Sequence, residues 1–183
     1  CVNELGYGTN VKLIQKFDRR IWRSYHHQGY LLSDIIQNGF DSSQLQNEAQ
    51  AHGTYTFFFG GDQALELCHI SMQEQLRDTY LHYFDAIFPG AGQAASPAEA
   101  SQKSFEVVDW PNNPLYFGSY ACFKPGQWTQ IAPYINQPID EIYFAGEHCS
   151  KDFQGFMNGA IQSSHQAIQD ILQSRVQEII KLT

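Results

Sequence analysis

The feature that most constrains this chain is a short apolar segment, residues 141–145, that ends in Gly146 and Glu147. We expect this segment to be a short buried strand. After a short loop, the glycine-rich stretch 154–160 opens a final helix, predicted over about 155–172 with room to extend toward Lys181. In α/β sheets, ligands bind beyond the carboxyl ends of the strands. Strand, loop and helix together therefore indicate the last unit of an α/β layer, with a ligand site at the strand end.

The residue types in this stretch suit a ligand that carries hydroxyls and an anionic or carbonyl-like group. Gly146 lets a ligand approach the backbone closely, and Glu147 can accept hydrogen bonds from ribose or ribityl hydroxyls. Backbone N–H groups at a helix N-terminus favour an anion or a carbonyl-like partner, and Gly155 and Gly159 keep that approach open. An ordinary strand–loop–helix unit with a glycine-rich connection explains the spacing as well.

The rest of the chain predicts a sheet followed by connecting segments. Apolar residues recur at three- and four-residue spacing from Met72 to Ile87, which is typical of a helix. Residues 1–110 are predicted as an antiparallel sheet with a helix packed on it, 111–136 as a connecting segment, and 137–183 as the C-terminal strand and helix of an α/β layer. The fold class is thus mixed α+β and α/β. The predicted strands span about 11–17, 29–36, 55–59 and 105–110, the helix about 71–88, and turn or loop structure 39–43 and 91–102.

Composition excludes several classes of protein. With 43% hydrophobic and 14% aromatic residues among 183, the chain can build a packed core and is not disordered. Its formal net charge is −8, so phosphate neutralisation gains nothing and nucleic acid is excluded as a partner. No apolar run approaches the roughly 20 residues of a transmembrane segment. The four cysteines and seven histidines match no metal-binding pattern, so no metal site is expected.

The stretch Phe144–Glu147, followed by Gly155–Ala160, resembles the C-terminal FAD-binding signature of the flavin-containing amine oxidase family. This family includes monoamine oxidases, polyamine oxidases and L-amino-acid oxidases. The resemblance implies that Glu147 holds the ribityl–pyrophosphate part of FAD, and that the helix start faces the pyrimidine end of the isoalloxazine. The implied cofactor-binding residues are Trp110, Gly146, Glu147, Gly155, Phe156, Met157, Asn158, Gly159 and Ala160.

The resemblance extends to the N-terminal part of the chain. Residues 7–13 are similar to the family's strand whose lysine points at flavin N5 through a water, which implies that Lys12 is the catalytic residue. A solvated strand lysine is the alternative. The resemblance places Phe58 in the substrate cavity, although a core phenylalanine fits that position equally. The implied substrate-binding residues are Phe58, Tyr120, Gly155 and Phe156.

Two departures from the family pattern change the expected site. Some members attach FAD covalently through a cysteine in the region that matches 118–120, where this chain has none and Cys122 is displaced by several positions. FAD is therefore expected to be non-covalent. The family's GxGxxG fingerprint is also absent, and we expect it upstream of Cys1. The upstream portion of the same enzyme is thus an expected partner, without which the fold and the flavin site are incomplete.

The resemblance implies FAD-dependent oxidative deamination of a small-molecule amine or L-amino acid. The products would be an imine, which hydrolyses to a keto acid or aldehyde, with ammonia and, from O2, hydrogen peroxide. The spacing from Gly118 to Gln127 resembles the amino-acid oxidase subgroup. The second hypothesis is a non-catalytic folded fragment or binding module that cannot hold FAD alone. A homo-oligomer is compatible with both hypotheses.

Overall fold

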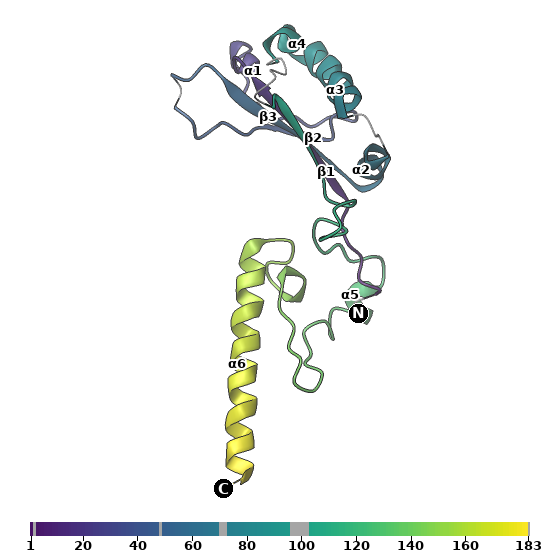
Figure 1. Ribbon diagram of the computed structural model, residues 1–183, viewed down its shortest axis with the longest axis vertical. Coiled ribbons are helices and arrows are strands. Elements are labelled where there is room, and N and C mark those ends of the chain that lie inside the picture. The colour runs from purple at the N-terminus through teal and green to yellow at the C-terminus, as the bar shows by residue number, and fades with distance from the viewer. Residues whose placement is uncertain (2, 48, 70–72, 96–102, 183) are drawn as a thin grey trace. The chain divides into compact units, whose positions relative to one another are not determined.

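The computed structural model describes residues 1, 3–47, 49–69, 73–95 and 103–182 (Figure 1). Its contacts divide the chain into two compact units. One unit is Thr9–Gly118, and the other combines Cys1–Gly8 with Ser119–Thr183. The two units are built differently, the first around a sheet and the second around one long helix.

The unit Thr9–Gly118 contains a four-stranded antiparallel sheet in the order β2-β3-β1-β4. Lys12 on β1 lies opposite Phe58 on β3 and Val108 on β4. These three side chains therefore share one face of the sheet, because residues paired across strands point to the same side. The strands are β1 (Asn10–Phe17), β2 (Asn38–Asp41), β3 (Gly53–Gly60) and β4 (Phe105–Asp109).

Helices of the same unit cover the other face of the sheet, and aromatic rings fill the space between. Alternate residues of β1 and β3, such as Leu13 and Phe57, are fully buried, as the two-residue period of a strand requires. Phe84 of the main helix packs on Tyr55 with ring centroids 4.4 Å apart. The sheet with a packed helix matches the predicted architecture of this region. The helices are α1 (Ile21–Ser24), α2 (Gly61–Cys68), α3 (Gln73–Ile87) and α4 (Ala91–Ala94).

The predicted strand at 29–36 is wrong. There the chain makes one isolated bridge, Leu31 to Gly39, and then turns. The turn is closed by Ser33, whose hydroxyl accepts the Ile36 amide at 2.8 Å, a typical serine turn. The strand is instead β2, within the stretch predicted as a turn, because Gly39 fits beneath Tyr55. A Cβ at Gly39 would lie 2.7 Å from the Tyr55 hydroxyl.

The helix predicted over 71–88 is confirmed as α3, whereas Met72, the first residue of its pattern, lies outside the described residues. The predicted loop 91–102 begins with the short helix α4, and residues 96–102 lie outside the described part. The left-handed Gly90 (φ +93°) ends α3 and starts α4.

The second unit joins the N-terminal segment to residues far along the chain. The Gly8 amide donates to Tyr120 O at 2.7 Å, and the Cys122 amide donates to Gly6 O at 2.9 Å. The side chain of Gln127 accepts the Gly6 amide at 2.9 Å. These bonds fix the backbone on both sides of Ala121. The helices of this unit are α5 (Gln127–Gln130), the 3-10 turn η1 (Glu147–Cys149) and α6 (Met157–Leu182).

The predicted final helix is confirmed as α6, which starts two residues later than expected and runs on to Leu182. The predicted buried strand at 141–145 is wrong for this structure, since Ile142 is 61% exposed and forms one isolated bridge with Ile139. A strand needs partners for its N–H and C=O groups, and among the described residues only the isolated bridge to Ile139 supplies one. Within the described residues, no helix is apolar enough over sufficient length to cross a membrane.

The units divide at Gly8/Thr9 and Gly118/Ser119. We expected residues 1–110 to belong to the substrate-binding domain, 111–136 to connect, and 137–183 to belong to the FAD-binding domain. This assignment stays a prediction.

Candidate functional site

The Glu147 carboxylate connects two loops of the second unit. Its Oε1 accepts the Ala121 amide at 2.7 Å, and its Oε2 accepts the Gly155 amide at 2.7 Å. We call this arrangement of Glu147, Ala121 and Gly155 the Glu147 bridge. A carboxylate offers about four lone-pair positions, so each oxygen of Glu147 keeps capacity for a further donor such as a ligand hydroxyl.

Gly146 is held to α6 by one serine. The Ser163 hydroxyl accepts the Gly146 amide at 2.9 Å and donates to the Gly146 carbonyl at 2.8 Å. Gly146 has φ +147°, a conformation open essentially to glycine alone, and a Cβ there would collide with the His148 ring. The sequence analysis missed Ser163. The one sequence feature that could have indicated it is a serine six residues after the start of α6, on the helix face that meets the loop.

The start of α6 offers backbone donors. The Phe156 amide donates to Phe153 O and the Gly159 amide to Phe156 O. Among the described residues, no acceptor pairs with the amides of Met157 and Asn158. Unpaired N–H groups at the positive end of a 26-residue helix suit an anionic or carbonyl-like group. Gly159 has a further role, since a Cβ there would collide with the Phe153 carbonyl.

Two aromatic side chains flank the Glu147 bridge. Tyr120 is 39% exposed and precedes Ala121, whereas Phe156 is 68% exposed and follows Gly155. A Cβ on Gly155 would lie 4.0 Å from Tyr120 Cδ2, so Gly155 packs against the Tyr120 ring. The structure thus brings Tyr120, Glu147, Gly155 and Phe156 close together, and their roles toward cofactor and substrate stay predictions.

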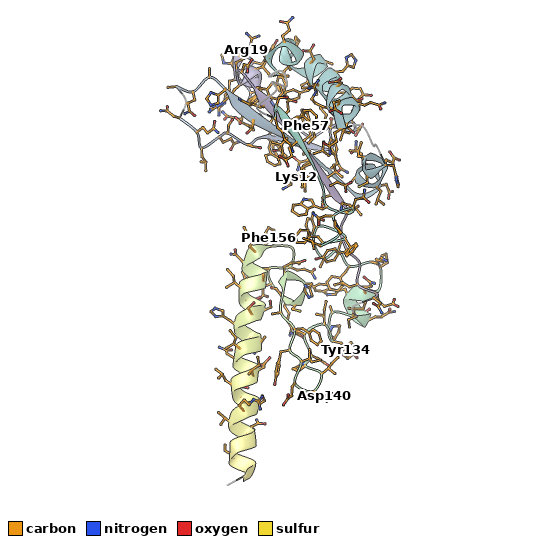
Figure 2. All side chains as sticks on the ribbon, viewed as in Figure 1. Lys12, Arg19, Phe57, Tyr134, Asp140 and Phe156 are labelled. Atoms are coloured by element: carbon orange, nitrogen blue, oxygen red, sulfur yellow. The ribbon has the colours of Figure 1, made fainter. Side chains whose placement is uncertain are left out.

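In the sheet unit, Lys12 and Phe58 form a pair on the face opposite the aromatic core. Figure 2 labels Lys12 together with the core residue Phe57. Lys12 Nζ lies 5.3 Å from the centroid of the Phe58 ring, within the range of a cation–π contact. Phe58 is half-buried, whereas Phe57 and Phe59 on either side are fully buried. Phe58 thus lies outside the fully buried core of this unit, and its place in a substrate cavity stays a prediction.

Trp110 closes the end of β4 in the same unit. Its ring packs edge-on against Tyr116, with centroids 5.4 Å apart at 74°. Its amide donates to Asn10 O at 3.4 Å. Trp110 is half-buried, which leaves part of the indole open to a ligand.

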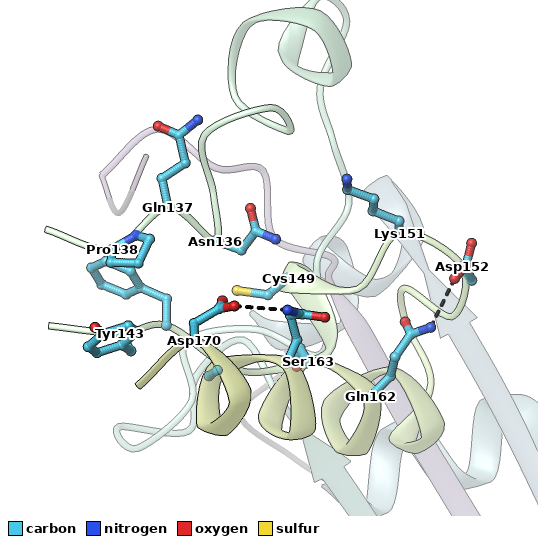
Figure 3. Close-up of a pocket in the computed structure, with 13 residues that line it drawn as sticks. Asn136, Gln137, Pro138, Tyr143, Cys149, Lys151, Asp152, Gln162, Ser163 and Asp170 are labelled. Carbon is cyan, nitrogen blue, oxygen red and sulfur yellow. Dashed lines mark hydrogen bonds between the residues drawn. The ribbon is translucent and has the colours of Figure 1, made fainter. Parts of the chain in front are cut away.

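A cavity of about 460 Å³ lies in the second unit between α6 and the segment 136–152 (Figure 3). Polar side chains in its wall bond to one another, Gln162 to Asp152 and Gln166 to Asp170, each at 2.9 Å. Burial, with a smaller contribution from the Glu147 carboxylate, raises the pKa of the Cys149 thiol in this wall. No residue predicted for the cofactor or substrate lines the cavity, so we do not place the flavin there.

Comparison with known proteins gives the family. The family model described as "Flavin containing amine oxidoreductase" matches residues 2–172. The chain belongs to this family. Membership confirms the predicted family and, with it, the expected flavin cofactor.

Relatives and solved structures agree with this assignment. The chain is 24% identical over 175 residues to human "Amine oxidase [flavin-containing] B", covering 93% of this chain and 32% of that protein. It is 30% identical over 168 residues to "L-amino acid dehydrogenase" from Synechocystis, covering 90% and 33%. The fold is similar to cyclohexylamine oxidase from Brevibacterium oxydans, with TM-score 0.77, 19% identity and coverage of 94% and 36%. The fold is also similar to putrescine oxidase bound to putrescine, with TM-score 0.76 and 18% identity. That match covers 91% of this chain and 36% of the putrescine oxidase chain. The chain thus spans about a third of the length of the relatives it matches.

Proposed function

We propose that the protein carrying this chain deaminates an L-amino acid or amine oxidatively, and that this chain holds part of its FAD. The observation that carries the proposal is the Glu147 bridge beside the open amides of α6, in a chain of the flavin-containing family. A hydride equivalent leaves the carbon that bears the amine, and the imine hydrolyses to a keto acid or aldehyde and ammonia. Bound FAD supplies the two-electron acceptor and passes the electrons to O2, which becomes hydrogen peroxide.

The residues of the second unit fit part of an FAD. The lone pairs of Glu147 beyond its two bonds to amides would accept ribityl hydroxyls. The unpaired amides of Met157 and Asn158 would face the electron-rich pyrimidine end. Gly146, without a Cβ, would leave room for the cofactor. We propose non-covalent attachment, because residues 118–120 include no cysteine.

The residues of the sheet unit fit the reacting side. Among the described residues Lys12 forms an ion pair with no carboxylate, and its ammonium lies over the Phe58 ring. Its ammonium would hold a water through its N–H donors. Phe58 would supply an apolar wall that excludes bulk water. Tyr120 and Phe156 are the substrate-binding side chains that we propose in the second unit. Trp110 would pack beside the flavin.

We also propose that residues 137–183 are the last strand and helix of a Rossmann-like FAD domain. The segment 141–145 would then gain its strand partners from the upstream portion of the same enzyme. Two observations support this proposal. Ile142 is exposed although the segment is apolar, and the chain spans about a third of its relatives.

We favour an L-amino acid as the substrate. Two observations support this choice, the spacing from Gly118 to Gln127 and the 30% identity to a relative named L-amino acid dehydrogenase. The test is oxygen uptake by the full-length protein with a panel of L-amino acids and of amines that lack the carboxylate. Ammonia and peroxide formed in equal amounts from the amino acids alone would support the proposal. Turnover of the simple amines alone would reassign the substrate class. A protein that binds no flavin and takes up no oxygen would favour the non-catalytic module.

A further inference from the structure

We propose that Glu147 is a positioning residue for the substrate-facing aromatic pair, Tyr120 and Phe156. The inference rests on the proposed function in one respect, that these two rings face the substrate. The inference goes beyond an FAD contact, because the Glu147 carboxylate also binds two backbone amides of the protein itself. One carboxylate fixes both segments that carry the two rings.

The bonds of the Glu147 bridge act one residue away from each ring. Ala121, whose amide is bound at 2.7 Å, directly follows Tyr120. Gly155, whose amide is also bound at 2.7 Å, directly precedes Phe156. The two amides lie 26 and 8 residues from Glu147 in sequence. The carboxylate therefore helps to hold the backbone beneath both rings, and at Tyr120 it adds to the bond from the Gly8 amide to Tyr120 O.

Glu147 has a rigid base. The neighbouring Gly146 is fixed to α6 at its amide and its carbonyl by Ser163. On the other side, Cys149 is buried and its amide donates to Gly146 O at 3.0 Å. The carboxylate thus links both segments to α6. Gly155 lies in a turn, and Ala121 forms one isolated bridge, with Tyr7.

Of the similar side chains, only glutamate can accept hydrogen bonds from both backbone amides at this position. Both donors are backbone N–H groups, so both side-chain oxygens must accept. Glutamine offers one acceptor oxygen and turns an NH2 donor toward the second amide. Aspartate keeps two acceptors but is shorter by one methylene, about 1.5 Å, and cannot reach both loops from the same backbone position.

The experiment uses the FAD-loaded, full-length protein with the variants Glu147→Gln and Glu147→Asp. The matched control is Glu141→Gln, at a side chain that is 83% exposed. Because Glu147 is also proposed to accept ribityl hydroxyls, we expect both Glu147 variants to hold FAD more weakly, and the assays therefore contain saturating FAD. KM for the substrate should rise roughly tenfold or more, the factor for one lost charge-assisted hydrogen bond, while kcat changes less than about threefold. The control should keep both constants.

Hydrogen exchange gives a readout that does not need turnover. In the Glu147 variants, the amides of Ala121 and Gly155 should exchange roughly tenfold faster, because each loses its acceptor. Unchanged exchange at both amides in both variants would overturn the inference, and so would an unchanged KM with FAD bound. Loss of FAD with protected amides would also overturn it, in favour of a contact to FAD alone. If the wild-type protein oxidises no amine, the proposed function fails separately, and exchange still decides whether the bridge exists.

Discussion

The Ser163 hydroxyl bonds to Gly146 at both its amide and its carbonyl, at 2.9 and 2.8 Å. One side chain of α6 thus fixes the glycine that precedes Glu147. Because Ser163 is 6% exposed, water cannot readily replace the hydroxyl. The loop that carries Glu147 therefore depends on this contact.

We predict that Ser163→Ala lowers the free energy of local opening of residues 144–150 by about 1–2 kcal/mol, since the part-buried Gly146 amide loses its acceptor. The Gly146 carbonyl keeps the Cys149 amide as a donor. Hydrogen exchange of peptides from this segment measures the effect. Ser164→Ala is the matched control, because the Ser164 hydroxyl donates to Ala160 O within its own helix. Equal exchange in both variants would show that the Ser163 contact contributes nothing.

Lys12→Met should reduce turnover and flavin reoxidation on the order of 100-fold, the cost of misplacing a group beside the reacting atoms. The free energy of unfolding should change by less than about 0.5 kcal/mol, because Lys12 lies on the open face of the sheet. Lys16→Met, four residues along the same face, is the control. Rapid mixing with O2 measures reoxidation. A Lys12→Met protein with normal rates would remove Lys12 from the mechanism.

Gly159→Ala should destabilise the second unit by about 1–3 kcal/mol, because the new Cβ collides with the Phe153 carbonyl, and overpacked sites cost about this much. The same shift moves the first turn of α6, so FAD retention should fall. Chemical unfolding and the flavin-to-protein ratio after gel filtration measure the two effects. A fully stable Gly159→Ala protein with normal flavin content would mean that loop and helix are not packed this closely.

Cys68 should resist alkylation at pH 8.5. Burial and the hydrogen bond from its thiol to Asp109 at 3.1 Å raise the pKa of Cys68 to about 12, so the reactive thiolate is scarce. The exposed Cys1 and Cys122 should react before Cys68. Asp109→Asn removes the negative charge, lowers the pKa of Cys68 and should accelerate its labelling, as read by mass spectrometry. Rapid labelling of Cys68 in the unaltered protein would contradict this environment.

Sequence pattern predicts those elements whose burial follows from local periodicity. Helices α3 and α6 have apolar or small residues at helical spacing. In β1 and β3 burial alternates along most of each strand, with Leu13 and Phe57 fully buried. The pattern fails where a tertiary contact decides the structure. Gly39 reads as a turn residue but pairs in β2 because only glycine fits beneath Tyr55.

The sequence likewise predicts some parts of the candidate site and not others. Glu147 is recognisable as a carboxylate after an apolar segment, and the glycines of the α6 start are visible in the sequence. The hydrogen bonds of Glu147 to Ala121 and of Ser163 to Gly146 cannot be predicted from the sequence. Neither an alanine nor a serine indicates which distant group it will contact. The segment 141–145 has the composition of a strand, but a strand also needs partners, and among the described residues only Ile139 supplies one.

The central claim is that this chain completes an FAD site that oxidises a carbon-bound amine. The most direct measurement is anaerobic addition of an L-amino acid to the FAD-loaded, full-length protein, followed at the oxidised flavin band at about 450 nm. We predict that the band bleaches within the turnover time and returns when O2 is admitted, with one hydrogen peroxide formed per flavin reoxidised. A protein whose flavin band stays unchanged with every L-amino acid and amine tested would contradict the account.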